Sequence, residues 1–251
     1  MTAVHVLLNQ KGGVGKTTLA VNLAAVTYDV LVHPEPIFRA VAASLDHGDP
    51  QSPVLVVSTD PQASAVWWSQ RVDAIPFDFA TVHNADELRS LRDLHYAHVF
   101  VDTPGSLIDE KTLLATLEVC DDVLVPLPPE GLAFEPTVTT INTIRATTDI
   151  PYRVVVNNWD PRDGTSELVE TAKFIQANGW PMCNSVVRRY KVHTRAAVTG
   201  QVVTQYAKNR IAMEAAQDFY RLALELGYGG AAMPNIPAQQ GDSEEAVHAA
   251  R

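Results

Sequence analysis

Cysteine is scarce in this chain. Only Cys120 and Cys183 occur among 251 residues, and they do not form a CxxC spacing. Two cysteines are too few for a disulfide framework. The eight histidines are scattered and form no zinc-binding pattern. We therefore expect two ordinary reduced thiols and a fold that depends on its apolar core.

Long apolar runs are also missing. No uninterrupted apolar segment approaches the roughly 20 residues that a membrane helix needs. The N-terminal residues enter a strand pattern without the basic segment, apolar core and cleavage site of a signal peptide. We therefore expect a cytoplasmic protein.

Acidic residues are absent from one long stretch. Residues 171–213 contain no Asp or Glu but seven Lys or Arg, which gives this stretch a charge of +7. Because the total net charge is −10, the rest of the chain carries −17. Such asymmetry predicts a localised anionic partner, and DNA phosphates fit this role. The alternative is a basic face that contacts only solvent. Arg188 has a further alternative, which is to contact a nucleotide or a dimer partner. The candidate DNA-binding residues are Arg188, Arg189, Lys191, Arg195, Lys208 and Arg210.

Strand-like and helical patterns alternate along the chain. Apolar, β-branched runs occupy residues 4–8, 54–59, 77–82, 98–102, 123–126, 153–157 and 183–187. Helical patterns occupy residues 16–27, 63–72, 84–94, 109–119, 135–147, 166–178 and 211–226. This alternation predicts an α/β fold with a mostly parallel twisted sheet and helices on both faces. Residues 1–228 are predicted to form a single domain with an insertion at about 28–53, followed by a disordered tail at 229–251.

The segment QKGGVGKTT, residues 10–18, joins the first strand pattern to the first helical pattern. In such a unit, glycines let the backbone wrap around phosphates and successive N–H groups point at them. Lys16 is placed to reach the β- and γ-phosphates, and Thr17 offers its hydroxyl to Mg²⁺. The predicted nucleotide-binding residues of this loop are Gly12, Gly13, Val14, Gly15, Lys16, Thr17 and Thr18.

A second lysine, Lys11, opens the K-G-G-V-G-K-T-T stretch. This stretch resembles the deviant Walker A loop of the ParA/MinD family of P-loop ATPases, and the resemblance extends over about residues 3–226. It implies a nucleotide-dependent homodimer that sandwiches ATP, in which Lys11 acts on the nucleotide held by the partner's Lys16. Gln10, in place of the standard first glycine, is a common variant in the partition branch of the family.

Two further segments resemble family motifs. STDPQASA, residues 58–65, is similar to the switch pattern D-x-D-P-Q, with Ser58 in place of its first aspartate. The resemblance makes Asp60 the residue that positions the attacking water, whereas a plain turn is the alternative. HVFVDTPGS, residues 98–106, has a Walker B pattern, in which Asp102 holds Mg²⁺ through a water. The predicted catalytic residues are Lys11, Lys16 and Asp60, and the predicted metal-holding residues are Thr17 and Asp102.

The segment RVVVNNWDPRDG resembles the family's base-contacting segment, which makes Asn157 the candidate for contact with adenine. A strand-ending Asn that starts a turn is the alternative. Trp67 and Trp68 cannot both face one side of a helix. We therefore expect one of them in the core and the other at a partner.

The resemblance implies a ParA-type DNA-partition ATPase with ATP and Mg²⁺ as cofactors. Such a protein binds nonspecific DNA on the nucleoid, and a ParB-like centromere-binding adaptor stimulates its slow hydrolysis to segregate a plasmid, phage or chromosome. The alternatives are a MinD-like positioning ATPase and a non-hydrolysing nucleotide-dependent scaffold, which Ser58 leaves open. A MinD-like membrane anchor needs a basic amphipathic C-terminal helix, whereas the tail is acidic, so no membrane partner is expected.

Overall fold

The computed structural model describes residues 2–33, 52–60, 68, 75–105, 110–206 and 209–228. Their strands form one seven-stranded sheet in the order β3-β2-β4-β1-β5-β6-β7, with parallel pairing throughout. The strands are β1 (Ala3–Leu7), β2 (Val54–Ser58), β3 (Asp78–Thr81), β4 (His98–Asp102), β5 (Asp122–Leu127), β6 (Tyr152–Trp159) and β7 (Val187–Arg188). The predicted fold class is confirmed.

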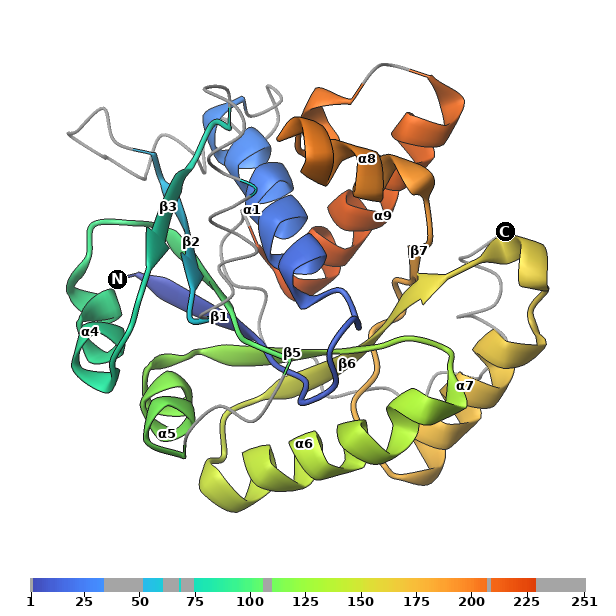
Figure 1. Ribbon diagram of the computed structural model, residues 1–251, viewed down its shortest axis with the longest axis horizontal. Helices are drawn as coiled ribbons and strands as arrows, with labels where there is room; N and C mark the ends of the chain where they lie inside the picture. The colour runs from blue at the N-terminus through green and yellow to red at the C-terminus, as the bar shows by residue number, and fades with distance from the viewer. Residues whose placement is uncertain are drawn as a thin grey trace.

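Helices cover both faces of the sheet (Figure 1). One face carries α1 (Lys16–Val32), α8 (Lys191–Thr199) and α9 (Arg210–Leu226). The other carries α4 (Ala85–Arg89), α5 (Glu110–Val119), α6 (Phe134–Thr147) and α7 (Ser166–Ala177). Short 3₁₀ turns include η1 (Ser90–Asp93), η2 (Gly131–Ala133), η3 (Pro161–Asp163) and η4 (Val203–Gln205). None of the helices described is long and apolar enough to cross a membrane.

Alternation along the strands divides the core into two clusters. In β4, Phe100 points to the α1 and α9 side, whereas Val99 and Val101 point to the side of α4 to α7. This is the period of two that β-strands impose. Because both faces are covered, the central strands are almost continuously apolar.

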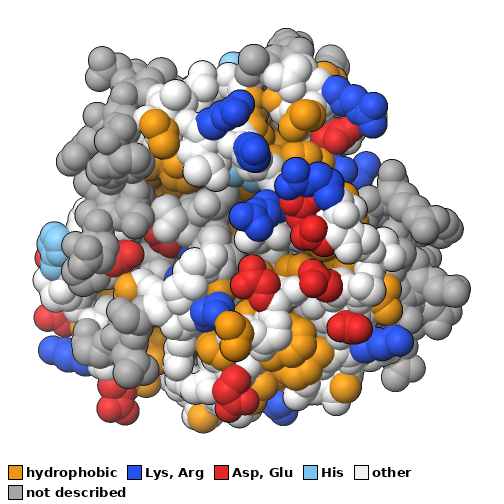
Figure 2. Space-filling view, turned by 45° about the vertical axis from the view of Figure 1, so that its right-hand side comes forward, with side chains coloured by type: hydrophobic (Ala, Val, Ile, Leu, Met, Phe, Trp, Pro, Cys, Tyr) orange, Lys and Arg blue, Asp and Glu red, His pale blue; other side chains and the backbone are white. Residues whose placement is uncertain are grey.

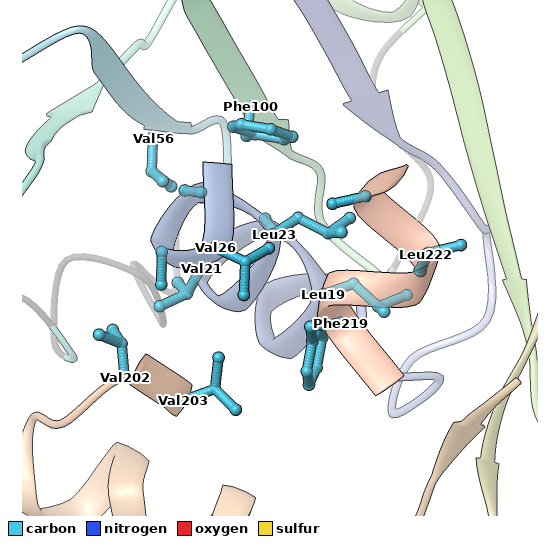
Figure 3. Close-up of a cluster of buried hydrophobic side chains, with 14 of the residues drawn as sticks. Leu19, Val21, Leu23, Val26, Val56, Phe100, Val202, Val203, Phe219 and Leu222 are labelled. Atoms are coloured by element: carbon cyan, nitrogen blue, oxygen red, sulfur yellow. The ribbon is translucent and has the colours of Figure 1, made fainter. Parts of the chain in front are cut away.

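Helix α1 is the centre of one cluster (Figure 3). Leu19, Leu23 and Val26 are fully buried, between the sheet on one side and Phe219 of α9 on another. A helix that is apolar on nearly all sides is typical of such a position. The first turn of α1, which follows the phosphate loop, is therefore fixed to the core of the domain.

Six of the predicted strands are confirmed to within two residues at each end, but the last was wrong. Residues 183–187 were expected as a strand, whereas β7 contains only Val187 and Arg188. The backbone N–H groups of Asn184 and Ser185 donate to the carboxylate of Glu225 on α9. Since those donors are taken by a side chain, they do not form a ladder with β6.

Helix α8 was not predicted. It begins after Tyr190 and ends at Gly200, which has φ 69° and accommodates the left-handed cap. Helix α1 also continues to Val32, five residues beyond the predicted end, so the first part of the predicted insertion is helical. Of the predicted helix at 63–72, only Trp68 lies within the described residues, and the rest of the insertion and the tail lie outside them, except residues 33, 52 and 53.

Candidate nucleotide-binding site

The phosphate loop connects the carboxyl end of β1 to the first turn of α1. Gly13 and Gly15 have φ values of 78° and 89°, which L side chains rarely adopt. Gly15 caps α1, and the first turn of this helix contains no acidic residue. Its free N–H groups and the positive end of the helix dipole are therefore available to an anion.

Lys16 is the first residue of α1, and its side chain is buried against the loop. Its Nζ donates to the backbone oxygens of Asn9, at 2.9 Å, and Lys11, at 3.2 Å. Burial lowers the pKa of Lys16 below its ordinary value, whereas the charges of Asp102 and Asp60 raise it. The ammonium group thus lies inside the curve of the loop, next to two carboxylates that favour its charged form.

Thr17 and Asp102 meet at the ends of α1 and β4. Thr17 Oγ1 donates to Asp102 Oδ2 at 2.7 Å, and Asp102 is fully buried. Burial raises the pKa of Asp102 to about 7, although the Thr17 hydrogen bond and the Lys16 charge lower it.

The second carboxylate oxygen of Asp102, Oδ1, is buried without a hydrogen-bond partner among the described residues. A buried carboxylate oxygen with no donor calls for a cation or a water that a cation holds. A hydroxyl and a carboxylate are the hard oxygen ligands that suit Mg²⁺ when phosphates supply further ones. Thr17 and Asp102 therefore fit the predicted metal.

Asp60 lies beside these groups, just past the end of β2. The N–H and hydroxyl of Thr59 both donate to the backbone oxygen of Asp102, at 3.0 and 3.3 Å, which joins the ends of β2 and β4. The N–H of Asp60 donates to Ser58 Oγ at 3.3 Å. The charge of Asp60 is close enough to raise the pKa of both Lys16 and Asp102. Pro61 and Gln62, the rest of the predicted switch, lie outside the described residues.

Asn157 supports the loop from β6. Its Nδ2 donates to the backbone oxygen of Val14 at 2.7 Å, and its side chain is buried. A Cβ on Gly15 would lie 2.4 Å from this Nδ2. Asn157 thus packs against the loop backbone, and its contact with adenine stays a prediction.

Three polar residues that the sequence analysis did not single out anchor the other side of the loop. Asn9 donates to Thr137 on α6, and the N–H of Gln10 donates to Thr140 one turn further along that helix. The sequence offered one indication of this anchor, which is the position of Asn9 between an apolar strand and the loop. Its partners, about 130 residues away, were not visible as a pattern.

The turn after Asp102 packs against the phosphate loop. A Cβ on Gly105 would lie 2.5 Å from Gly12 Cα and 3.5 Å from the carbonyl carbon of Lys11. The 2.5 Å contact is shorter than real Cβ atoms essentially ever show, and the obstacle is backbone. Any side chain at position 105 must therefore displace one of the two segments.

We accordingly expect Gly105→Ala to weaken ATP binding by about tenfold or more, because a displacement of about 1 Å in such a site has large effects. Gly131→Ala is the matched control, since a Cβ there meets nothing within 4 Å. Titration with a fluorescent ATP analogue gives both dissociation constants. Equal affinities for the two variants would contradict the contact.

Comparison with known proteins places this geometry in a family. The chain is 37% identical over 225 residues to maintenance of carboxysome distribution protein A from Gloeobacter kilaueensis, covering 89% of this chain and 93% of the relative. The chain belongs to the ParA/MinD family of P-loop ATPases. The protein of the same name from Halothiobacillus neapolitanus is 28% identical over 202 residues, covering 78% of this chain and 84% of the relative. No protein-family model matches the chain.

Solved structures of the ParA/MinD family agree with this fold. The septum site-determining protein MinD from Pyrococcus horikoshii, complexed with Mg-ADP, superposes with a TM-score of 0.65 at 17% identity, over 90% of this chain and 96% of that one. At this identity the likeness is evidence of the fold alone. Both relatives are named for the distribution of carboxysomes and not for the segregation of DNA.

The predicted DNA-binding residues of this ParA/MinD domain comprise one mostly buried residue, one outside the described residues and four exposed ones. Arg188 is mostly buried, and its Nη2 and Nε hydrogen-bond to Asp218 on α9 at 2.7 and 2.9 Å. Lys208 lies outside the described residues. Four exposed residues around β7, α8 and the start of α9 form what we call the basic face, and Lys and Arg gather in this region in Figure 2. The basic face consists of Arg189, Lys191, Arg195 and Arg210.

Of the tryptophan pair, Trp68 is the core member. It is buried in the cluster around α1, and its Nε1 donates to the backbone oxygen of Gln201 at 3.0 Å. Trp67 lies outside the described residues.

Proposed function

We propose that this chain hydrolyses ATP as a nucleotide-dependent homodimer that binds nonspecific DNA and positions a cargo through an adaptor protein. The observation that carries the proposal is the meeting of Lys16, Thr17 and Asp102 at one edge of the sheet, with Lys11 in the same loop. Phosphoryl transfer needs positioning and charge stabilisation more than covalent chemistry. These residues supply both.

Each residue has a distinct role in the proposed hydrolysis. Lys16 and the N–H groups of the loop hold the β- and γ-phosphates, and Asp60 orients the attacking water. Thr17 and Asp102 would hold Mg²⁺, which would supply positive charge to neutralise the phosphates when bound. The partly exposed carboxylate of Asp60 and the buried carboxylate of Asp102 both lie close to the Lys16 ammonium group that would hold the phosphates.

The remaining residue is Lys11, which acts on the nucleotide held by the second subunit. Its side chain is partly exposed, while the interior of its own loop is already filled by the Lys16 ammonium group. A charge supplied by a second subunit makes hydrolysis depend on assembly. ATP hydrolysis then limits the lifetime of the dimer, and the adaptor shortens this lifetime by stimulating hydrolysis.

The basic face gives the proposed DNA contact. Its guanidinium and ammonium groups are exposed and lie on adjacent segments, as nonspecific phosphate contacts require. Arg188 contributes indirectly, because its ion pair with Asp218 ties β7 to α9 and so supports the segment that carries Arg189. Arg210 also pairs with Glu214, so we expect it to contribute less than Lys191 or Arg195.

We expect ATP-dependent DNA binding that weakens steeply with salt. Arg195→Glu and Lys191→Glu should each lower affinity and reduce the slope of log K against log salt by about one for each lost contact. Lys173→Glu on α7, at an exposed position on the opposite side of the sheet, is the control. Fluorescence anisotropy with a duplex of arbitrary sequence measures these slopes, and a slope near zero for the wild type would contradict DNA binding.

The proposed cargo is a carboxysome or a similar protein-shelled body, as the names of the two relatives suggest. The test is deletion of the gene in its own host, followed by imaging of labelled carboxysomes together with assays of plasmid and chromosome loss. Clustered carboxysomes with normal DNA inheritance would support the proposal. Normal carboxysome spacing with loss of a replicon would instead favour DNA partition.

A further inference from the structure

Asn9 is a fully buried polar residue between β1 and the phosphate loop, and its side chain has three partners. Oδ1 accepts from the N–H of Lys11 at 2.9 Å. Nδ2 donates to the backbone oxygen of Pro126 on β5 and to Thr137 Oγ1 on α6, both at 2.9 Å. One amide therefore connects the backbone of Lys11 to two elements of the core.

The chemistry of the three partners fixes the orientation of this amide. The N–H of Lys11 can only donate and the oxygen of Pro126 can only accept, so a flipped amide would break both bonds. The Thr137 hydroxyl donates to the oxygen of Ala133 at 2.8 Å, which leaves its lone pairs for Asn9. A buried amide with both donors used and one acceptor used is expensive to disturb.

Different core side chains anchor the two ends of the loop, and the Lys16 ammonium group bonds to the backbone oxygens of Asn9 and Lys11 between them. Residues 9–11 depend on β5 and α6 through Asn9, with a further bond from the N–H of Gln10 to Thr140 at 3.0 Å. The glycine-rich end depends on β6 through Asn157, whose Nδ2 holds the oxygen of Val14. Loss of one anchor therefore leaves the other in place.

We propose that Asn9 is a positioning residue for Lys11. It fixes the backbone from which the Lys11 side chain leaves the loop, while Asn157 fixes the part of the loop that binds the phosphates. This inference rests on the proposed function, because it presumes that Lys11 takes part in ATP hydrolysis. A charge that must reach a second subunit is sensitive to its point of origin, since a misplacement of about 1 Å costs on the order of 10²-fold in rate.

The expected signature is a separation of turnover from affinity. Asn9→Ala should lower the kcat for ATP by about 10- to 100-fold while the ATP dissociation constant changes by less than about threefold. Asn157→Ala should show the opposite pattern, with its main effect on affinity. Asn9→Asp should resemble Asn9→Ala, because a carboxylate cannot donate to Pro126 or Thr137.

A second set of variants leaves Asn9 itself intact. Thr137→Val removes the acceptor for Nδ2 and should lower kcat in the same way, whereas Thr137→Ser keeps the hydroxyl and should recover most of the rate. Thr139→Val is the matched control, because Thr139 is exposed on the same helix and makes the same kind of bond to its own backbone. Thermal unfolding of each variant establishes that it is folded.

The deciding measurement adds Asn9→Ala to Lys11→Ala. If Asn9 acts through Lys11, the second substitution lowers neither the residual single-turnover rate nor the ATP affinity any further. The inference would be overturned if Asn9→Ala lost kcat and affinity equally, or if its kcat were unchanged. It would also be overturned if Thr137→Val and Thr139→Val had equal effects on kcat. Full turnover in Lys11→Ala alone would instead overturn the role of Lys11 in the proposed function.

Discussion

Lys11→Ala is expected to bind ATP with an affinity close to that of the wild type but to lose nearly all turnover. The residues that hold the phosphates and the metal lie elsewhere, since Lys16 and Thr17 begin α1 and Asp102 ends β4. What disappears is a positive charge at the γ-phosphate in the transition state. For charges supplied across an interface, such a loss is on the order of 10³-fold or more.

The control for this substitution is Lys173→Ala, which removes an exposed lysine from α7, on the other face of the sheet. Steady-state phosphate release and equilibrium ATP binding are measured on both variants. Turnover of Lys11→Ala within about twofold of the control would contradict the role of Lys11. Loss of ATP binding in parallel with turnover would show that Lys11 is a binding residue of its own loop.

Asp102→Asn is expected to make the protein more stable and far less active. Asn retains an oxygen that can accept from Thr17 but removes the carboxylate, a ligand that Mg²⁺ prefers. We expect ATP turnover to fall by about 10² to 10³-fold at saturating Mg²⁺. Phosphate release at increasing Mg²⁺ concentrations measures the loss, and wild-type turnover at low Mg²⁺ would contradict the metal role.

The expected gain in stability depends on pH. Burial raises the pKa of Asp102 to about 7 in the folded protein, whereas an unfolded Asp has a pKa of about 3.9. Between these values the folded state binds a proton that the unfolded state has released, so the stability of the metal-free protein falls as pH rises from about 4 to about 7. The free energy of unfolding of Asp102→Asn should therefore exceed that of the wild type by an amount on the order of a few kcal/mol at pH 8.

Unfolding by urea without Mg²⁺ or nucleotide, at pH 8 and at pH 4.5, measures this difference. It should be large at pH 8 and small at pH 4.5. Asp163→Asn, at an exposed position, controls for the loss of one negative charge. A variant that is less stable than the wild type at both pH values would contradict the assigned burial penalty.

The phosphate loop was predictable from sequence because its structure is local. Gly13 and Gly15 allow positive φ, and Lys16 and Thr17 follow at fixed spacing in the first turn of a helix. The sheet was predictable for a similar reason, since continuous apolar runs of strand length leave few other arrangements. Asp102 could be assigned because it ends such a run.

Other features depend on contacts between distant residues. Its place in a basic segment predicts Arg188 as a DNA contact, but its guanidinium is held by Asp218, 30 residues later. The predicted strand at 183–187 is shortened by Glu225 in the same way. Asn9 escaped notice because its significance lies in Pro126 and Thr137. In each case a single side chain far along the chain decides the outcome, and no periodicity reveals it.

Lys11 is proposed to act on the nucleotide of a second subunit, and mixing two inactive variants tests this role. Lys11→Ala and Asp60→Ala subunits are each prepared inactive, then combined in equal amounts with ATP and assayed for phosphate release. If Lys11 acts across the dimer, a mixed dimer contains one complete site, with Asp60 from one subunit and Lys11 from the other. Random pairing should then restore about a quarter of wild-type turnover, because half of the dimers are mixed and each has one working site of two. If the mixture remains as inactive as its components, Lys11 does not act across the dimer, and the account is contradicted.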